Sequence, residues 1–297
     1  MSKMTYEEVI AGIEEHKPWY QRIEFPDYNV ATTDKDEWTW FDAAGDNKYG
    51  DMMSEDASRQ RPQPKWQRIK EFVSPYIVGN DVLEIGCAHG FYSLAFAKMG
   101  AKSVLGIDKN DCLKSAKFAN QVLGYKNVDF RFLNLFDASH PHAPCMNDRT
   151  GASDITIPRV DTVFCSSALA HFLYPMLGLH KMATIADKYF ILDDGYAGLS
   201  DGKHMPTANF YWSGTSYGNV WGLSLRLVVK FLWRVGYSPS AMSILFYPKE
   251  NDVKGPKRMC LVLDKTKDQS YVDPKDIELW GGRDYPNRFE LPGLRTE

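Results

Sequence analysis

The sequence predicts an α/β fold: a doubly wound, Rossmann-like parallel sheet with an N-terminal aromatic cap and antiparallel strands at the C-terminal edge. Between residues 81 and 194, short apolar runs alternate with helix-length amphipathic segments. The helical segments in the first half of this region end at glycine, a common helix terminator. Beyond residue 240, two apolar runs follow each other without a helix between them. Strands that alternate with helices form parallel βαβ units, whereas adjacent strands pair in antiparallel fashion.

The chain before the sheet predicts two helices with an irregular segment between them. Residues 4–16 are acidic and amphipathic, which indicates a short helix. The aromatic segment 16–42 is interrupted by two prolines, so an irregular or short-strand cap is expected there. After a polar stretch, apolar residues at helical spacing predict the second helix over 64–78.

The sheet itself is expected to begin at residue 81. The predicted strands are 81–86, 103–108, 128–134, 160–167 and 188–194, with helices over 90–100 and 112–124. An aromatic loop over 195–221, a helix over 222–236 and strands over 242–248 and 257–264 are expected to follow. We therefore divide the chain into a cap (1–78), a ligand-binding domain (79–264) and a C-terminal surface tail (265–297).

Composition excludes several classes of protein. A net charge of -3 provides no basic field, so nucleic acid and anionic membranes are not expected partners. The five cysteines have no CxxC spacing, which is typical of a reduced, cytoplasmic protein. No metal site is expected, because the loosely spaced His140, His142 and Cys145 are separated by prolines and lack a second ligand pair. The sequence leaves open whether the chain forms a homo-oligomer.

The turn after the first strand carries the clearest functional signal. It contains Glu84, Gly86, Cys87 and Gly90 in the pattern E-x-G-x-x-x-G, which departs from the three-glycine dinucleotide fingerprint. A carboxylate accepts hydrogen bonds from an ammonium group and repels phosphate. Asp108 ends the second strand, where an acid can accept both hydroxyls of a ribose. These features favour S-adenosylmethionine (SAM) as the cofactor, with S-adenosylhomocysteine (SAH) as its product.

Three stretches make the chain resemble the class I SAM-dependent methyltransferases, and more closely the tRNA wobble-uridine carboxymethyltransferase-like family. They are "HKPWYQRIEF", "PKWQRIKEFVSPYIVGNDVLEIGCAHGFYSLAFAKMGAKSVLGID" and "VDTVFCSSALAHFLYP". The resemblance implies that Gly86 and Gly90 pack against the methionine part of SAM and that Asp108 holds the ribose. It further implies cofactor roles for Lys65, Asn134, Leu135 and Ser166. Ala170 stands where that enzyme has a tyrosine that helps to hold the carboxymethyl group, which favours ordinary methyl transfer.

Three residues are candidates for acid–base catalysis. A hydroxyl or a protonated amine must lose a proton to accept a methyl group, whereas a thioether needs no base. His171 follows the fourth strand and is the first candidate, although it could instead cap or pack under the next helix. Asp193 and Asp194 end the fifth strand and are second candidates; either could equally bind a substrate ammonium group.

Aromatic and basic residues outside the turn are expected to bind the methyl acceptor. The candidates are Trp19, Tyr20, Arg59, Arg61, Tyr211, Trp212 and Trp221. Aromatic faces suit a cationic or apolar small molecule, but the same residues could form a second small core. The basic patch 58–68 could also contact RNA phosphates.

The favoured function is therefore methyl transfer from SAM to a small molecule: an amine, a hydroxyl or a thioether, for example an amino acid such as methionine. Two alternatives remain. One is a tRNA wobble-uridine-modifying methyl- or carboxymethyltransferase. The other is a nicotinamide-dependent oxidoreductase, which the missing third glycine disfavours.

Overall fold

The computed structural model describes residues 3–19, 21–33, 62–110, 112–136, 157–195, 208–212, 219–247, 258–268 and 295–296. For residues 195, 209–212, 219–220, 246–247 and 295–296 it describes the backbone alone. The chain divides into two compact units, Met1–Asn134 and Leu135–Glu297. The sequence-based boundaries after residues 78 and 264 lie elsewhere, and that three-part division stays a prediction.

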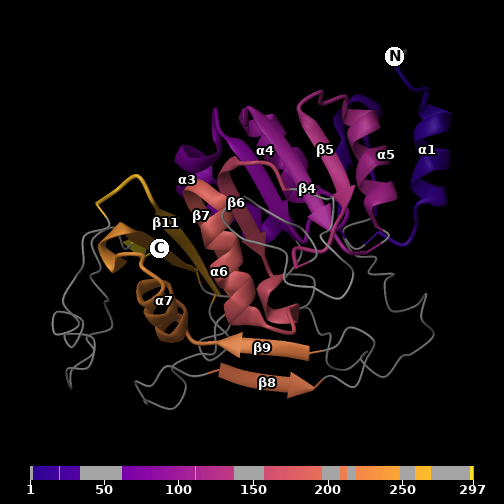
Figure 1. Ribbon diagram of the computed structural model, residues 1–297. Helices are drawn as coiled ribbons and strands as arrows, with labels where there is room; N and C mark the ends of the chain where they lie inside the picture. Colours follow the sequence, from indigo (N-terminus) through magenta and orange to yellow (C-terminus); the bar gives the residue numbers. More distant parts are fainter. Residues whose placement is uncertain are drawn as a thin grey trace. The chain divides into compact units, whose positions relative to one another are not determined.

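The first unit alternates helices with short strands. In chain order these elements are α1 (Tyr6–Glu15), β1 (Glu24–Phe25), η1 (Pro26–Tyr28), β2 (Val30–Ala31), α3 (Pro62–Ile77), β3 (Asp81–Ile85), α4 (Phe91–Met99), β4 (Ser103–Asp108), α5 (Leu113–Leu123) and β5 (Val128–Phe132). β4 pairs in parallel with β3 on one side and β5 on the other. The arrows of β4 and β5 accordingly point the same way in Figure 1. The carboxyl ends of these strands therefore lie at one edge, as the βαβ pattern predicted.

Local sequence signals explain where the helices of this unit begin and end. Thr5 and Glu8 form a reciprocal capping box that starts α1. Gly100 and Gly124 end α4 and α5 in the left-handed conformation that glycine adopts without steric cost. The helix predicted over 64–78 begins two residues earlier, at Pro62, because proline is well tolerated in a first helical turn.

The N-terminal segment is part of the core of the first unit. Val9, Trp19, Phe25, Phe118 and Phe130 belong to one buried cluster that joins α1, the β1–β2 hairpin, α5 and β5. Figure 1 shows α1 alongside α5. The expected aromatic cap is thus a packed layer against α5.

The second unit combines parallel and antiparallel strands. Its elements are β6 (Val160–Ser166), η4 (Leu169–His171), α6 (Pro175–Ile185), β7 (Ala186–Gly195), β8 (Ala208–Trp212), β9 (Asn219–Leu223), α7 (Leu225–Arg234), η5 (Pro239–Ala241), β10 (Met242–Tyr247), β11 (Arg258–Asp264) and β12 (Arg295–Thr296). β6 and β7 are parallel, whereas β11 pairs in antiparallel fashion with both β7 and β10. This confirms the antiparallel strands expected near the C-terminus.

The structure corrects two expectations in this unit. The segment 195–221 was expected to be a loop, but β8 and β9 form an antiparallel hairpin there, seen below α6 and α7 in Figure 1. α7 begins only at Leu225, because the preceding residues belong to β9 and Ser224 caps the helix. Within the segment expected to be a surface tail, Arg295–Thr296 pairs in parallel with β10.

Gly90 precedes α4 with φ +86°, and a Cβ there would lie 2.6 Å from the Phe130 ring. We expect Gly90→Ala to lower the free energy of unfolding by about 2–4 kcal/mol, because backbone strain adds to overpacking. Denaturant titration measures this loss. Gly124→Ala is the matched control, since Gly124 has φ +77° but no neighbour within 4 Å of the added Cβ. Equal losses in both variants would contradict the role given to the Phe130 contact.

Candidate active site

The turn after β3 is held against the end of β4 by backbone hydrogen bonds. Gly86 N and Cys87 N both donate to the Ile107 carbonyl, at 2.9 and 3.1 Å. Gly86, Ala88 and Gly90 all have positive φ angles, of +74°, +49° and +86°. The left-handed conformation is unfavourable for a residue with a Cβ, so the two glycines are the residues that allow this turn.

Asp108 is held at this turn by two backbone amides. Its Oδ2 accepts a hydrogen bond from Ala88 N at 2.9 Å, and its Oδ1 accepts one from Asn110 N at 2.9 Å. The residue is only 7% exposed. An ionised carboxylate has about four lone-pair positions, so about two remain for another donor. The structure therefore brings Asp108 to the glycine turn, as the sequence predicted.

Glu84 has a partner inside the protein. Its carboxylate accepts a hydrogen bond from the Ser93 hydroxyl, at 2.5 Å, in the first turn of α4. Burial raises the pKa of Glu84 to about 8. The acid predicted to receive an ammonium group is thus bound to a serine of α4, and the sequence analysis missed Ser93 as its partner.

The N-terminal segment covers the same turn. The Gln21 side-chain oxygen accepts a hydrogen bond from Phe91 N, the first amide of α4, at 3.1 Å. The Trp19 ring lies 5.2 Å from the ring of His89, whose pKa burial lowers to about 4. Free amides at a helix N-terminus are what bind phosphate. Because Gln21 occupies the first of these amides, the turn is poorly suited to a pyrophosphate. Nothing in the spacing of Gln21 or His89 signalled these contacts.

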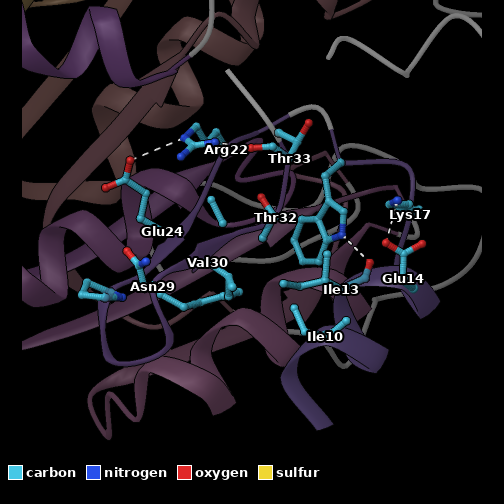
Figure 2. Close-up of a pocket in the computed structure, with 14 residues that line it drawn as sticks. Ile10, Ile13, Glu14, Lys17, Arg22, Glu24, Asn29, Val30, Thr32 and Thr33 are labelled. Atoms are coloured by element: carbon cyan, nitrogen blue, oxygen red, sulfur yellow. Dashed lines mark hydrogen bonds and ion pairs between the residues drawn. The ribbon is translucent and has the colours of Figure 1, made fainter. Parts of the chain in front are cut away.

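Trp19 bounds a cavity of about 660 Å³ within the first unit. Its indole N–H donates to the Ile13 carbonyl at 2.9 Å, and the residue is only 1% exposed, so it forms part of the wall. Figure 2 shows the ion pairs Glu14–Lys17 and Arg22–Glu24 on different sides of this cavity. Tyr20, Arg59 and Arg61, the other acceptor candidates of the cap, lie outside the described residues.

The remaining predicted cofactor residues have varied surroundings. Lys65, on α3, and Cys87, in the turn, are buried, and burial raises the pKa of the Cys87 thiol well above its usual range. A thiol with a raised pKa stays protonated and is unreactive. Asn134 is half-buried and Leu135 is buried. Both lie shortly after Phe132, the last residue of β5.

In the second unit, Ser166 and Asp193 belong to a buried polar network. Ser166 Oγ donates to Asp193 Oδ2 at 2.6 Å, and Arg258 Nη2 lies 3.3 Å from the same oxygen. Asp193 has no exposed surface. The nomination of Asp193 as a base does not fit this geometry, because its carboxylate is committed to a serine and an arginine. The sequence analysis missed Arg258, which lies at the start of the apolar strand β11.

His171 and Asp194 differ in their access to solvent. His171 ends η4 and is exposed, and the nearby Leu173 and Tyr174 are 59% and 60% exposed. Asp194 is buried at 8% exposure. His171 is therefore the more accessible of the two remaining base candidates.

The β8–β9 hairpin carries three of the predicted acceptor-binding residues and lies against η4. β9 packs on η4 and carries the half-buried Trp221. Tyr211 and Trp212 are on β8, where their side chains lie outside the described residues. Among the described residues there is no group of three or more His, Cys, Asp or Glu side chains that could hold a metal ion, and no helix long and apolar enough to cross a membrane.

Solved structures define the class of the fold. The N-terminal domain of EvdMO1, determined in the presence of SAH and D-fucose, superposes with a TM-score of 0.60 at 19% identity, covering 88% of this chain and 97% of that one. Magnesium protoporphyrin IX methyltransferase from Synechocystis PCC 6803, with bound SAH, gives a TM-score of 0.51 at 18% identity over 76% and 97% of the two chains. The predicted α/β, Rossmann-like methyltransferase fold is confirmed.

A family model described as a methyltransferase domain matches residues 78–226, half of the chain, and the chain belongs to this family. The chain therefore contains a methyltransferase domain, as the sequence predicted. The tRNA U34 carboxymethyltransferase of Nautilia profundicola is 27% identical over 158 residues, which are 50% of this chain and 46% of that protein. The corresponding protein of Methylococcus capsulatus is 40% identical over 48 residues, 16% of this chain and 14% of that protein. The chain thus spans less than half the length of the curated relatives it matches.

The raised pKa of Glu84 predicts a pH-dependent stability. The folded state binds this proton more tightly than the unfolded chain, in which the pKa is near 4.5. The stabilisation is therefore complete below about pH 4.5 and is lost as the pH rises through about 8. Between about pH 5 and 8, the free energy of unfolding should fall less in Glu84→Gln than in the unmodified protein, as measured by denaturant titration.

His89 contributes the opposite trend, because its folded pKa is lowered from 6.5 to about 4, but it does so equally in both proteins. Glu71→Gln, at an exposed position on α3, is the control and should follow the unmodified protein. The same slope in all three proteins would show that Glu84 does not titrate in this range.

Proposed function

We propose that the protein transfers the methyl group of SAM to a small-molecule acceptor: an amine, a hydroxyl or a thioether, for example an amino acid such as methionine. The observation that carries the proposal is the Asp108 carboxylate, held at the glycine turn by Ala88 N with lone pairs to spare. The net charge of -3 supports a small acceptor over a polyanion.

The residues of the first unit fit SAM. In this proposal Asp108 accepts the ribose hydroxyls, and the turn between Gly86 and Gly90 receives the methionine part. The buried carboxyl of Glu84 ionises more readily beside a cation, so it favours the ammonium and sulfonium charges of the ligand. The proposed cofactor set also includes five residues from the two units: Lys65, Cys87 and Asn134 of the first, and Leu135 and Ser166 of the second.

SAM supplies a methyl carbon that is already activated, because the thioether leaves without charge. The work left to the chain is to align the acceptor, exclude water and remove a proton where the acceptor carries one. His171 is the proposed base, since it is exposed and imidazole is a common general base in enzymes. Asp194 is the second candidate. Asp193 acts instead through its partners Ser166 and Arg258.

The proposed acceptor-binding residues are aromatic or basic: Trp19, Tyr20, Arg59, Arg61, Tyr211, Trp212 and Trp221. Trp19 would take part as a wall of the cavity in Figure 2. Trp221 supports an acceptor position near His171, because its strand packs on η4.

Modification of tRNA is the second candidate function. It is favoured by the names of the two curated relatives, both tRNA U34 carboxymethyltransferases. Against it stand the low net charge and Ala170, which replaces the tyrosine expected of a carboxymethyl-transferring relative. Membership in the methyltransferase family is common to both candidates.

Asp108→Asn tests the cofactor site. Asparagine keeps one acceptor oxygen but loses the charge, so we expect SAH to bind about 10- to 100-fold more weakly by calorimetry. Asp129→Asn is the control, because Asp129 lies on the exposed side of β5 and pairs with Arg131. Unchanged SAH affinity in Asp108→Asn would refute the ribose assignment.

Transfer of radiolabel from methyl-labelled SAM tests the acceptor class. With a metabolite extract and bulk tRNA offered in separate reactions, we expect label in the metabolites and background counts in tRNA. Label mainly in tRNA would end the small-molecule proposal.

The pH dependence of the rate tests whether a base is used. An acceptor that must lose a proton gives a rate that rises with pH as the base becomes deprotonated. A thioether acceptor gives a flat profile between about pH 6 and 9.

A further inference from the structure

A single guanidinium nitrogen joins three groups at the carboxyl ends of β6 and β7. Arg258 Nη2 donates to Ser167 Oγ at 2.9 Å and to Asp193 Oδ2 and the Asp193 carbonyl at 3.3 Å each. The side chains of Arg258 and Asp193 are 10% and 0% exposed. A buried charge needs a partner, and here each charge has the other.

Ser167 is the point at which the chain leaves β6. Its φ is +57°, an unusual value for a residue with a Cβ. Its N–H donates to the Asp193 carbonyl at 2.9 Å, and its hydroxyl is held by Arg258. Ser166, the residue before it, is bonded to the Asp193 carboxylate. We call the segment Ser166–His171 the corner. Both of its serines are hydrogen-bonded to Asp193 or Arg258.

The corner leads directly into η4, which ends at His171. η4 is a single 3₁₀ turn of three residues, too short to define its own orientation by cooperative hydrogen bonding. The direction in which the chain leaves Ser167 therefore sets the position of His171. The sequence points to the same residue, because Arg258 is the one cation in the apolar β11 run RMCLVLD.

We propose that Arg258 is a positioning residue for methyl transfer, one that fixes the Ser166–His171 corner through Ser167 and Asp193 and thereby orients His171 toward the acceptor. This inference rests on the proposed function, because it gives Arg258 its effect through the proposed base. The ion pair with Asp193 holds Arg258 in place, and the bond to Ser167 transmits that position to the corner.

Loss of one buried charge also destabilises a protein, so the test must separate stability from positioning. Arg258→Met leaves Asp193 uncompensated. The double variant Asp193→Asn with Arg258→Met removes both charges of this ion pair. The asparagine side chain can still accept a hydrogen bond from Ser166. Arg258→Lys keeps the charge but has a shorter, more flexible side chain without the planar guanidinium, so it should hold Ser167 and Asp193 less firmly.

Turnover is measured by methyl transfer from labelled SAM to the metabolite extract, with SAH affinity and melting temperature alongside. We expect the double variant to melt near the temperature of the unmodified protein and to bind SAH within threefold, yet to turn over at least tenfold more slowly. Arg258→Lys should fold and show an intermediate loss. Normal turnover in the double variant would show that the ion pair acts through stability alone.

The Arg159–Asp187 pair provides a matched control. It is an exposed, two-bond ion pair near the opposite ends of the same two strands. Arg159→Met should change neither turnover nor SAH affinity, because that pair lies far along β6 and β7 from the corner. A loss as large as that of Arg258→Lys would indicate that any disturbance of these strands suffices, and would overturn the inference.

A spectroscopic readout separates this inference from the proposed function. In protein labelled with ¹³C-histidine, the ring signal of His171 is assigned from its absence in His171→Gln. We expect that signal to shift in Arg258→Lys and in the double variant, and to stay in place in Arg159→Met. An unmoved signal refutes positioning whatever the activity, whereas a shifted signal in a protein that labels no metabolite refutes the proposed function alone.

Discussion

The hydrogen bond from Ala88 N to the Asp108 carboxylate is the contact on which the proposed chemistry depends. It ties the glycine turn after β3 to the last residue of β4. The donor, Ala88, has a φ of +49°. A second amide, from Asn110, fixes the other carboxylate oxygen. An acid held by backbone groups on both oxygens is pre-oriented, so little side-chain freedom is lost when a ribose binds.

The same turn also explains what this protein should not bind. Rossmann-like folds that take dinucleotides leave the first amides of the helix open for phosphate. Here Gln21 accepts from Phe91 N, and the carboxyl of Glu84 accepts from Ser93. One of these groups is a negatively charged carboxylate when ionised, which repels phosphate further. The absent third glycine and the occupied Phe91 amide are thus two independent arguments against a nicotinamide cofactor.

Unequal exposure of the titratable groups in the second unit separates their roles. Asp193 and Arg258 compensate each other inside the protein, so neither needs to change charge during a reaction. His171 is exposed at the end of a short 3₁₀ turn, where it is able to exchange protons with solvent or with an acceptor. The identity of these residues alone does not reveal that one acid is buried in a charge pair while the histidine is exposed to solvent.

What the sequence determined by itself was the alternation of strands and helices from β3 to β5, the glycine turn and the acid that ends β4, because each of these follows from local spacing and backbone preference. It could not separate Asp193 from Asp194, which are neighbours in the chain but differ in their partners. It also missed Gln21, Ser93 and Arg258, and it expected a loop where β8 and β9 pair. Only the tertiary structure decided these points, because they depend on which distant groups meet: Gln21 contacts Phe91 across 70 residues, and Arg258 contacts Ser167 across 91. Such pairings are set by packing of the whole unit, which no local pattern encodes.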